Sequence, residues 1–332
     1  MRFINRSDEV RKIEALWTNT RGPLLALLYG RRRVGKSHLL SQVFAGKRGV
    51  RFIATQATSP VILRAFLEES SSQLGDPDLT IANYPNWRVA LRYFLEAAKT
   101  ERLYLIFDEF GYLVRADKEA ASIIQALWTQ YAGKSKLRLI LCGSQVQLLA
   151  SLREEGRPLF GNIEYSKLIE PLSYRDAAAF APKWSDRDRL MLYGCLGGSG
   201  RYLDLVDDAD SLEKNLTNMI LDDGPLHDEG TLLLTMEDGI HDYAIYHAAL
   251  VAIAGGATQW GEIINQSGVT SGKLQKVLDT LVALRLVRHD LAFGDKSRGT
   301  FIIADTFLRS LYRLVEPHTT NRQLLNPSVY WH

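Results

Sequence analysis

The sequence predicts an α/β fold in which helices flank a parallel sheet, followed by a helical region and a small module of helices and two strands. Three observations lead to this prediction. Short apolar runs alternate with helical patterns up to about residue 170. A glycine-containing loop joins the first apolar run to a helix. From about residue 173 onward the pattern is mainly helical.

The composition is that of a globular chain with room for two or three domains, since 46% of the 332 residues are hydrophobic and 23% are charged. No apolar stretch reaches membrane-spanning length and the N-terminus lacks an apolar signal core, so we expect a cytoplasmic protein without a membrane partner. Cys142 and Cys195 lie in apolar surroundings, which predicts reduced core thiols and not a metal site.

The predicted strands are short and apolar, and the helices between them carry apolar residues at helical spacing. We expect strands at 24–29, 50–54, 103–107, 137–142 and 163–169. We expect helices at 9–20, 38–44, 60–74, 86–99 and 118–132. Continuous apolar runs are typical of parallel strands buried on both faces, so this alternation predicts helices on both sides of the sheet.

Residues 30–37 read Gly-Arg-Arg-Arg-Val-Gly-Lys-Ser, a complete phosphate-binding loop between a strand and a helix. The glycines let backbone N–H groups approach phosphates, and the helix N-terminus favours an anion. We expect Lys36 to reach the β- and γ-phosphates and Ser37 to bind Mg²⁺. The predicted cofactors are therefore ATP or ADP with Mg²⁺. The residues expected around the nucleotide phosphates are Gly30, Arg33, Val34, Gly35, Lys36, Ser37 and His38.

A second motif follows the strand predicted at 103–107, which ends in Asp108-Glu109. This is the Walker B pattern, in which Asp108 would hold Mg²⁺ and Glu109 would orient and polarise the attacking water. The next strand ends in Ser144-Gln145, and in such ATPases a polar residue there contacts the water or the γ-phosphate. Ser144 is the first candidate and Gln145 the second, with a helix cap as the alternative reading.

Together these residues resemble the archaeal-type P-loop ATPase family, in the signal-transducing branch of the AAA+ ATPases. The segments that carry the resemblance lie at 3–9, 28–37, 107–110, 142–144, 158–161, 171–173 and 197–203. The resemblance implies a P-loop ATPase core over 1–172 and a helical lid over 173–238. It also implies adenine contacts from Asn5 and Arg6, and a phosphate-sensing role for Arg201.

Two positions depart from the family pattern. Asn162 stands where the family usually has an arginine after a Leu-aromatic-Gly segment, and Gly200 replaces a proline. If that arginine stabilises charge, its loss predicts slow or partner-stimulated hydrolysis, with Arg153 or Arg157 as substitutes. In the family the proline fixes a turn that faces the nucleotide, so Gly200 predicts a different geometry of the lid at this turn.

Residues 239–332 resemble the winged helix-turn-helix that follows the core in the same family. We expect helices at 245–253, from a cap at Thr258 to 264, and at 271–284, then strands at 286–288 and 301–303 joined by a loop. The residues expected to contact duplex DNA are Lys273, Gln275, Lys276, Thr280, Lys296 and Arg298. The module has only 9 basic against 7 acidic residues, so protein docking or autoinhibition stays open.

Charge is unevenly spread, with 29 basic against 20 acidic residues in 1–200 but 2 against 11 in 201–238. The acidic stretch predicts a solvated helical face, with docking on a basic surface as the alternative.

The leading hypothesis is an ATP-hydrolysing switch that couples nucleotide state to a DNA-associated winged helix. One alternative is a DNA-binding regulator in which the nucleotide is structural. Another is a nucleotide-gated adaptor with negligible turnover that binds a protein effector such as a nuclease, transposition or defence factor. Assembly of several copies fits either reading, because AAA+-like proteins often complete their sites between subunits.

Overall fold

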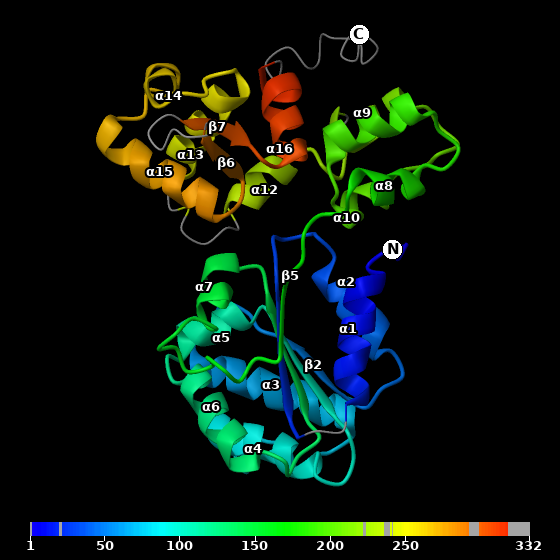
Figure 1. The fold of residues 1–332 in the computed structure, drawn as a ribbon, viewed down its shortest axis with the longest axis vertical. Helices are drawn as coiled ribbons and strands as arrows, with labels where there is room; N and C mark the ends of the chain where they lie inside the picture. Colours follow the sequence, from blue (N-terminus) through cyan, green and yellow to red (C-terminus); the bar gives the residue numbers. More distant parts are fainter. Residues whose placement is uncertain are drawn as a thin grey trace. The chain divides into compact units, whose positions relative to one another are not determined.

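The computed structural model describes residues 2–19, 22–221, 224–235, 240, 242–291 and 299–317, and their contacts divide them into two units (Figure 1). The sheet unit consists of Asn5–Arg31 and Gly35–Glu170. The helical unit consists of the described residues of Met1–Ile4, Arg32–Val34 and Pro171–His332. No helix in these described ranges is long and apolar enough to cross a membrane.

The sheet unit contains five strands that all run parallel, which confirms the predicted α/β class. The strands are β1 (Leu24–Tyr29), β2 (Gly49–Ile53), β3 (Tyr104–Asp108), β4 (Arg138–Gly143) and β5 (Tyr165–Leu168). Their order is β2-β3-β4-β1-β5, so β4 lies between the strand before the phosphate-binding loop and the strand that ends in Asp108. The register pairs Tyr29 with Gly143 and Ile53 with Asp108, which aligns the carboxyl ends of these strands.

Helices cover both faces of this sheet, with α1 and α2 on one side and α3 to α6 on the other (Figure 1). Alternate residues of the buried strands supply both cores: Leu25 and Leu27 pack with Phe66 and Phe94 on one face, whereas Leu24 and Ala26 meet α1 and α2 on the other. The helices are α1 (Ser7–Thr18), α2 (Lys36–Phe44), α3 (Ser59–Leu74), α4 (Trp87–Ala97), α5 (Phe110–Ala116), α6 (Ala120–Tyr131) and α7 (Val146–Ser151).

The exposed edge of β2 is covered by a side chain from α3. The Gln73 amide accepts a hydrogen bond from the backbone N–H of Arg51 (2.9 Å) and donates one to its carbonyl (2.8 Å). An edge strand offers unpaired backbone groups to other chains, so this pairing protects the edge. It also fixes the backbone of Arg51.

The helical unit contains mostly short helices and one antiparallel strand pair. Its first part comprises α8 (Tyr174–Ala177), η1 (Ala178–Phe180), α9 (Asp186–Leu196), α10 (Gly200–Leu203), α11 (Leu212–Leu216), η2 (Thr217–Leu221) and α12 (Glu229–Thr235). Its second part comprises α13 (Tyr243–Ala254), α14 (Trp260–Ser267), α15 (Ser271–Ala283), β6 (Val287–Leu291), β7 (Gly299–Ile303), α16 (Thr306–Ser310) and η3 (Leu311–Val315).

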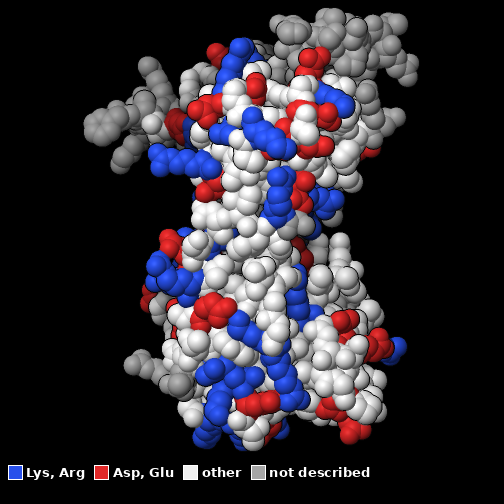
Figure 2. All heavy atoms as spheres, turned by 90° about the vertical axis from the view of Figure 1, so that its right-hand side faces the viewer, with Lys and Arg blue, Asp and Glu red and all other residues white. Residues whose placement is uncertain are grey.

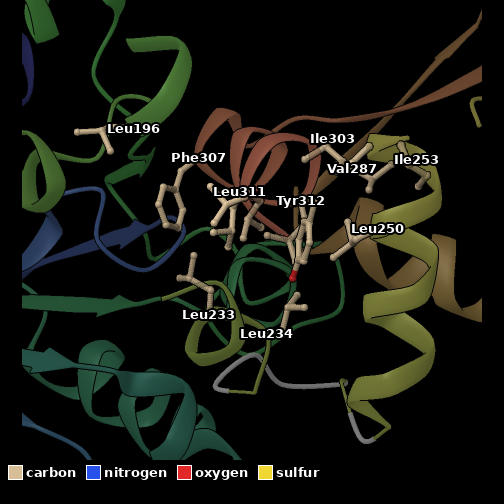
Figure 3. Close-up of a cluster of buried hydrophobic side chains, with 14 of the residues drawn as sticks. Leu196, Leu233, Leu234, Leu250, Ile253, Val287, Ile303, Phe307, Leu311 and Tyr312 are labelled. Atoms are coloured by element: carbon tan, nitrogen blue, oxygen red, sulfur yellow. The ribbon is translucent and has the colours of Figure 1, made fainter. Parts of the chain in front are cut away.

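One hydrophobic core runs through both parts of the helical unit (Figure 3). Phe307 and Leu311 sit at its centre, between Leu233 of α12 and Leu250 of α13. The Phe307 ring centroid lies 4.9 Å from that of Tyr202 on α10. The division into 1–172, 173–238 and 239–332 stays a prediction, and residues 238 and 239 lie outside the described ranges.

Two local differences from the expected elements have physical causes. The N-cap of α14 is Gln259 and not Thr258, because the Glu262 carboxylate accepts hydrogen bonds from both of their backbone N–H groups. The short helices α5 and α7 were not expected, since helices of 7 and 6 residues are too short to show a clear apolar period.

Candidate functional site

The candidate site lies at the carboxyl ends of β1, β4 and β3, where the loop of residues 30–35 leads into α2. A Cβ at Gly30 would lie 2.3 Å from the carbonyl oxygen of Ile169, so only glycine fits beside the chain that follows β5. Gly35 has a φ of +96°, which glycine adopts without strain, and it caps the N-terminus of α2. Both glycines are therefore required by the loop, Gly30 for space and Gly35 for its backbone conformation.

Lys36 is the first residue of α2 and is only 5% exposed. Its Nζ donates hydrogen bonds to the carbonyl oxygens of Gly30 (2.7 Å) and Arg31 (2.9 Å). A buried ammonium needs such partners to offset its loss of water. The charge of Lys36 is thus held against the backbone of the loop.

Asp108 at the end of β3 accepts hydrogen bonds from two other elements. Its Oδ2 lies 2.7 Å from Oγ of Ser37 and 2.6 Å from Nη2 of Arg51 on β2. Burial alone would raise the pKa of Asp108, but the hydrogen bonds from Arg51 and Ser37 and the charge of Arg51 lower it overall. The carboxylate is therefore ionised at neutral pH although it is only 2% exposed.

Glu109 follows in the left-handed conformation, with a φ of 54°. Non-glycine residues rarely adopt this conformation, and such positions cluster at functional sites. Its Oε2 accepts hydrogen bonds from the backbone N–H (3.1 Å) and the Oγ (2.9 Å) of Ser144 at the tip of β4. The second candidate at this tip, Gln145, is buried with its amide packed against Gly111.

The N-terminal segment meets the chain that follows β5. Asn5 and Arg6 both have left-handed φ values, 58° and 68°. Arg6 donates from Nη2 to the carbonyl oxygen of Glu170 (2.5 Å) and pairs with Glu9 at 3.7 Å. His38 lies half-buried in the first turn of α2.

Three residues of the loop, Arg32–Val34, belong to the helical unit. Arg33 has a φ of 69°, forms an ion pair with the buried Glu229, and donates from Nη1 to Oη of Tyr202 (3.3 Å). Ser199 Oγ donates to the carbonyl oxygen of Arg33 (3.1 Å). Burial lowers the pKa of Arg33, and the neighbouring charges of Arg201 and Arg32 lower it further.

The structure brings five predicted residues of the sheet unit together: Lys36, Ser37, Asp108, Glu109 and Ser144. Arg201 lies exposed on α10 in the helical unit. Asn162 donates from its amide to the carbonyl oxygen of Phe160 in its own turn (3.3 Å).

Arg51 is the site residue that the sequence analysis missed. It is the one charged residue in β2, a strand that pairs with the Asp108 strand. A single cation in an otherwise apolar strand indicates that a buried anion lies nearby. That this anion is Asp108 follows only from the pairing of β2 with β3.

In the C-terminal module, Lys273, Gln275 and Lys276 are exposed on α15. Gln275 donates to Oδ1 of Asp279 (2.8 Å), which places an acidic residue among them. Thr280 is half-buried and donates to the carbonyl oxygen of Lys276. Lys296 and Arg298 lie outside the described residues.

Several of the described acidic residues of 201–238 pair with basic residues of the same unit. Asp204 contacts Arg2 at 3.3 Å, Asp208 contacts Lys183 at 2.9 Å, and Asp210 contacts Lys214 at 2.8 Å. Acidic and basic side chains are intermixed over the upper part of the face in Figure 2, and basic side chains gather at its lower left. These local pairs favour the solvated face over a docking patch.

Sequence comparison finds relatives over most of the chain. A family described as an ATPase domain predominantly from Archaea matches residues 3–206. The uncharacterized protein MJECL04 of Methanocaldococcus jannaschii is 23% identical over 322 residues, which cover 95% of this chain and 69% of the relative. The uncharacterized ATP-binding protein MJ0423 of the same organism is 39% identical over 46 residues, which cover 14% of this chain and 76% of the relative.

Solved structures share the fold. The Walker-type ATPase PABY2304 of Pyrococcus abyssi matches with a TM-score of 0.68 at 20% identity, covering 94% of this chain and 96% of that one. The ORC2 protein of Aeropyrum pernix, solved as ADPNP-ADP complexes, matches with a TM-score of 0.63 at 15% identity, covering 96% and 94%. At these identities the likeness concerns the fold alone.

Proposed function

Since the chain belongs to the family of ATPase domains found predominantly in Archaea, we propose that it binds ATP with Mg²⁺, hydrolyses it, and couples nucleotide state to its winged-helix module. The observation that carries this proposal is the hydrogen-bonded series Ser37, Asp108, Glu109 and Ser144, which links the first turn of α2 to the carboxyl ends of the adjacent strands β3 and β4. Each of these residues is of the type that the proposed chemistry needs at its position.

Phosphate binding would use the loop and the N-terminus of α2. The positive end of the helix and the loop amides attract the phosphates. Lys36 would exchange the carbonyl oxygens of Gly30 and Arg31 for phosphate oxygens, which hold the ammonium more strongly because they are charged. Asn5 and Arg6 would contact the adenine.

The oxygen atoms of Ser37 and Asp108 suit Mg²⁺, which prefers hard oxygen ligands. The exposed hydroxyl of Ser37 and the ionised carboxylate of Asp108 already meet at 2.7 Å. Ser37 and Asp108 would therefore hold the metal. When bound, Mg²⁺ would neutralise charge on the β- and γ-phosphates.

Hydrolysis would require a water oriented toward the γ-phosphorus. Glu109 would orient and polarise that water, while Ser144 holds the carboxylate through Oε2. The water oxygen forms a bond to the γ-phosphorus, and the bond from that phosphorus to the bridging oxygen breaks to give ADP and phosphate. Arg201 would read the γ-phosphate from the helical unit.

Coupling to the winged helix is supported by contacts of the helical unit. Arg33 of the loop pairs with Glu229, and Ser199 binds the Arg33 carbonyl. The same unit contains the core shared by α9, α12, α13 and α16. A loop rearrangement on phosphate binding would therefore act on a unit whose parts are packed together. A ligand shifts such a unit only through contacts that differ between its two states.

The test is steady-state ATP hydrolysis by the wild type, Lys36→Ala and Glu109→Gln, with and without duplex DNA at low and moderate salt. We expect Lys36→Ala to lose nucleotide binding, and Glu109→Gln to bind ATP but to turn over at least about a hundredfold more slowly. Turnover that survives both substitutions would contradict the assignment.

The second candidate function is a nucleotide-gated adaptor with negligible turnover. Negligible turnover is favoured by Asn162, which stands in place of the family arginine and donates to its own turn, and it fits a DNA-binding regulator with a structural nucleotide equally well. Tight Mg²⁺-ATP binding without turnover in the wild type would support the adaptor. Salt-dependent retention of duplex DNA that weakens in Lys273→Ala and Lys276→Ala would instead support DNA association, because phosphate contacts release counterions.

A further inference from the structure

Arg51 and the proposed Mg²⁺ ligands meet at a single oxygen atom. Oδ2 of Asp108 accepts a hydrogen bond from Ser37 Oγ at 2.7 Å and another from Arg51 Nη2 at 2.6 Å. The loop motif and the Asp-Glu motif do not include residue 51. Arg51 is therefore an additional hydrogen-bond partner of Asp108 that neither motif supplies.

Two helices hold Arg51 in this position, one through its backbone and one through its guanidinium. Gln73 of α3 binds the backbone N–H and carbonyl of Arg51. Ser41 of α2 accepts a hydrogen bond from Arg51 Nη1 at 2.6 Å, and its own hydroxyl donates to the carbonyl oxygen of Ser37 at 3.0 Å. Ser41 thus links Arg51 to the helix turn that carries the proposed metal ligand Ser37.

We propose that Arg51 is a counter-ion that competes with Mg²⁺ for Asp108. This inference rests on the proposed nucleotide site. A dication near Oδ2 is repelled by the guanidinium and needs the lone pairs that Arg51 engages. In the nucleotide-free protein Arg51 neutralises the buried carboxylate, and it must give up Oδ2 before the metal binds. Arg51 therefore raises the Mg²⁺ concentration that tight nucleotide binding requires.

The test measures binding of a fluorescent ADP analogue by the wild type and Arg51→Gln, first in EDTA and then during a Mg²⁺ titration. The matched control is Arg48→Gln, the same change at an exposed arginine that pairs with Glu101 away from the site. Mg²⁺ also binds the analogue in free solution. That equilibrium is the same in every titration, so it cancels when the half-saturating Mg²⁺ concentrations of variant and wild type are divided.

We expect Arg51→Gln to lower the half-saturating Mg²⁺ concentration about tenfold, equivalent to about 1.4 kcal/mol. Arg48→Gln should leave it unchanged. Ser41→Ala removes one hydrogen-bond acceptor of the guanidinium and should lower the half-saturating Mg²⁺ concentration about two- to threefold. Because Ser41 is exposed, this variant provides a second test in case Arg51→Gln does not fold.

A half-saturating concentration that is unchanged or raised in both Arg51→Gln and Ser41→Ala would overturn the proposal. Failure of the wild type to bind the analogue with or without Mg²⁺ would instead refute the nucleotide site itself, and this inference with it.

Discussion

Ser144 shows how one side chain can serve the proposed reaction from outside the phosphate-binding loop and the Asp-Glu motif. Its hydroxyl and backbone N–H both hold Oε2 of Glu109, a residue already in a left-handed conformation. Removal of the hydroxyl leaves the N–H in place. The carboxylate would then keep one of two donors and lose part of its fixed orientation.

We therefore expect Ser144→Ala to lower kcat for ATP about 10- to 100-fold, while nucleotide affinity changes less than about threefold. Single-turnover hydrolysis and equilibrium binding would measure the two quantities. Ser151→Ala at the end of α7, whose hydroxyl binds the carbonyl of Leu148, serves as the control. An unchanged kcat in Ser144→Ala would remove Ser144 from the mechanism.

The two cysteines have thiols that burial keeps protonated. Burial raises the pKa of Cys195 to about 11, and it raises the pKa of the fully buried Cys142 well above the ordinary range. The thiolate is the reactive form, so at pH 8 native Cys195 should react with a disulfide reagent about two orders of magnitude more slowly than an exposed thiol. Its rate should rise about tenfold per pH unit up to pH 11.

Thiol titration in native buffer and in denaturant measures this difference. We expect two rapidly reacting thiols only after denaturation. A native thiol that reacts at the rate of an exposed cysteine would show that one of these sites opens readily.

Sequence patterns predicted the residues of the site that belong to contiguous motifs. Lys36, Ser37, Asp108 and Glu109 stand directly at the ends of apolar strands, where a local pattern carries the information. Arg51 could not be found in this way, because its contact with Asp108 depends on the pairing of β2 with β3. The pairing of Arg33 with Glu229 likewise joins residues far apart in the sequence.

At the scale of elements, the five strands of the parallel sheet were predicted within about two residues, because each is a short and mainly apolar run between helical patterns. The partners of charged residues inside a strand are harder to predict, because they come from distant parts of the sequence. Arg138 opens β4 and is 2% exposed. It donates to the carbonyl oxygens of Leu16, Asn19 and Gly22 and thereby ties the end of α1 to the sheet.

Burial of this guanidinium lowers the pKa of Arg138 to about 10, and the charge of Arg102 adds to the effect. Arg138 is nevertheless charged at neutral pH, and its hydrogen bonds satisfy carbonyl groups that would otherwise lose their partners. We expect Arg138→Ala to lower the free energy of unfolding by about 2–4 kcal/mol. Urea denaturation followed by tryptophan fluorescence would measure this loss.

The control is Lys136→Ala, which removes an exposed cation two residues earlier that binds the carbonyl of Thr100. Its effect should stay within about 0.5 kcal/mol. Equal losses in both variants would mean that charge alone, and not the carbonyl contacts, stabilises this end of the sheet.

At the scale of the whole molecule, the helical unit joins a predicted lid and a predicted winged helix through one core. Phe307 is 1% exposed and packs on Tyr202 of α10. Ser310 of α16 donates to the carbonyl oxygen of Cys195 on α9 at 2.8 Å. Helix α16 of the module thus packs against the first part of the unit.

We expect Phe307→Ala to cost about 3–5 kcal/mol and to weaken α9, α10 and α13 together. Hydrogen exchange would report this as a parallel loss of protection in all three helices. Leu314→Ala, at a position that is 44% exposed, is the control. Loss of protection confined to α13 would show that the two parts are energetically independent.

The position of α16 and η3 in the sequence also has a consequence for synthesis. The sheet unit is complete once Glu170 has left the ribosome, but Val315 of the helical unit follows about 145 residues later. At ordinary elongation rates that delay is roughly 7–30 s. During this time α9 and α10 lack the side chains of Phe307 and Leu311 and expose apolar surface. The nascent chain therefore passes through a stage in which the residues of the sheet unit are all present while the core of the helical unit is still incomplete.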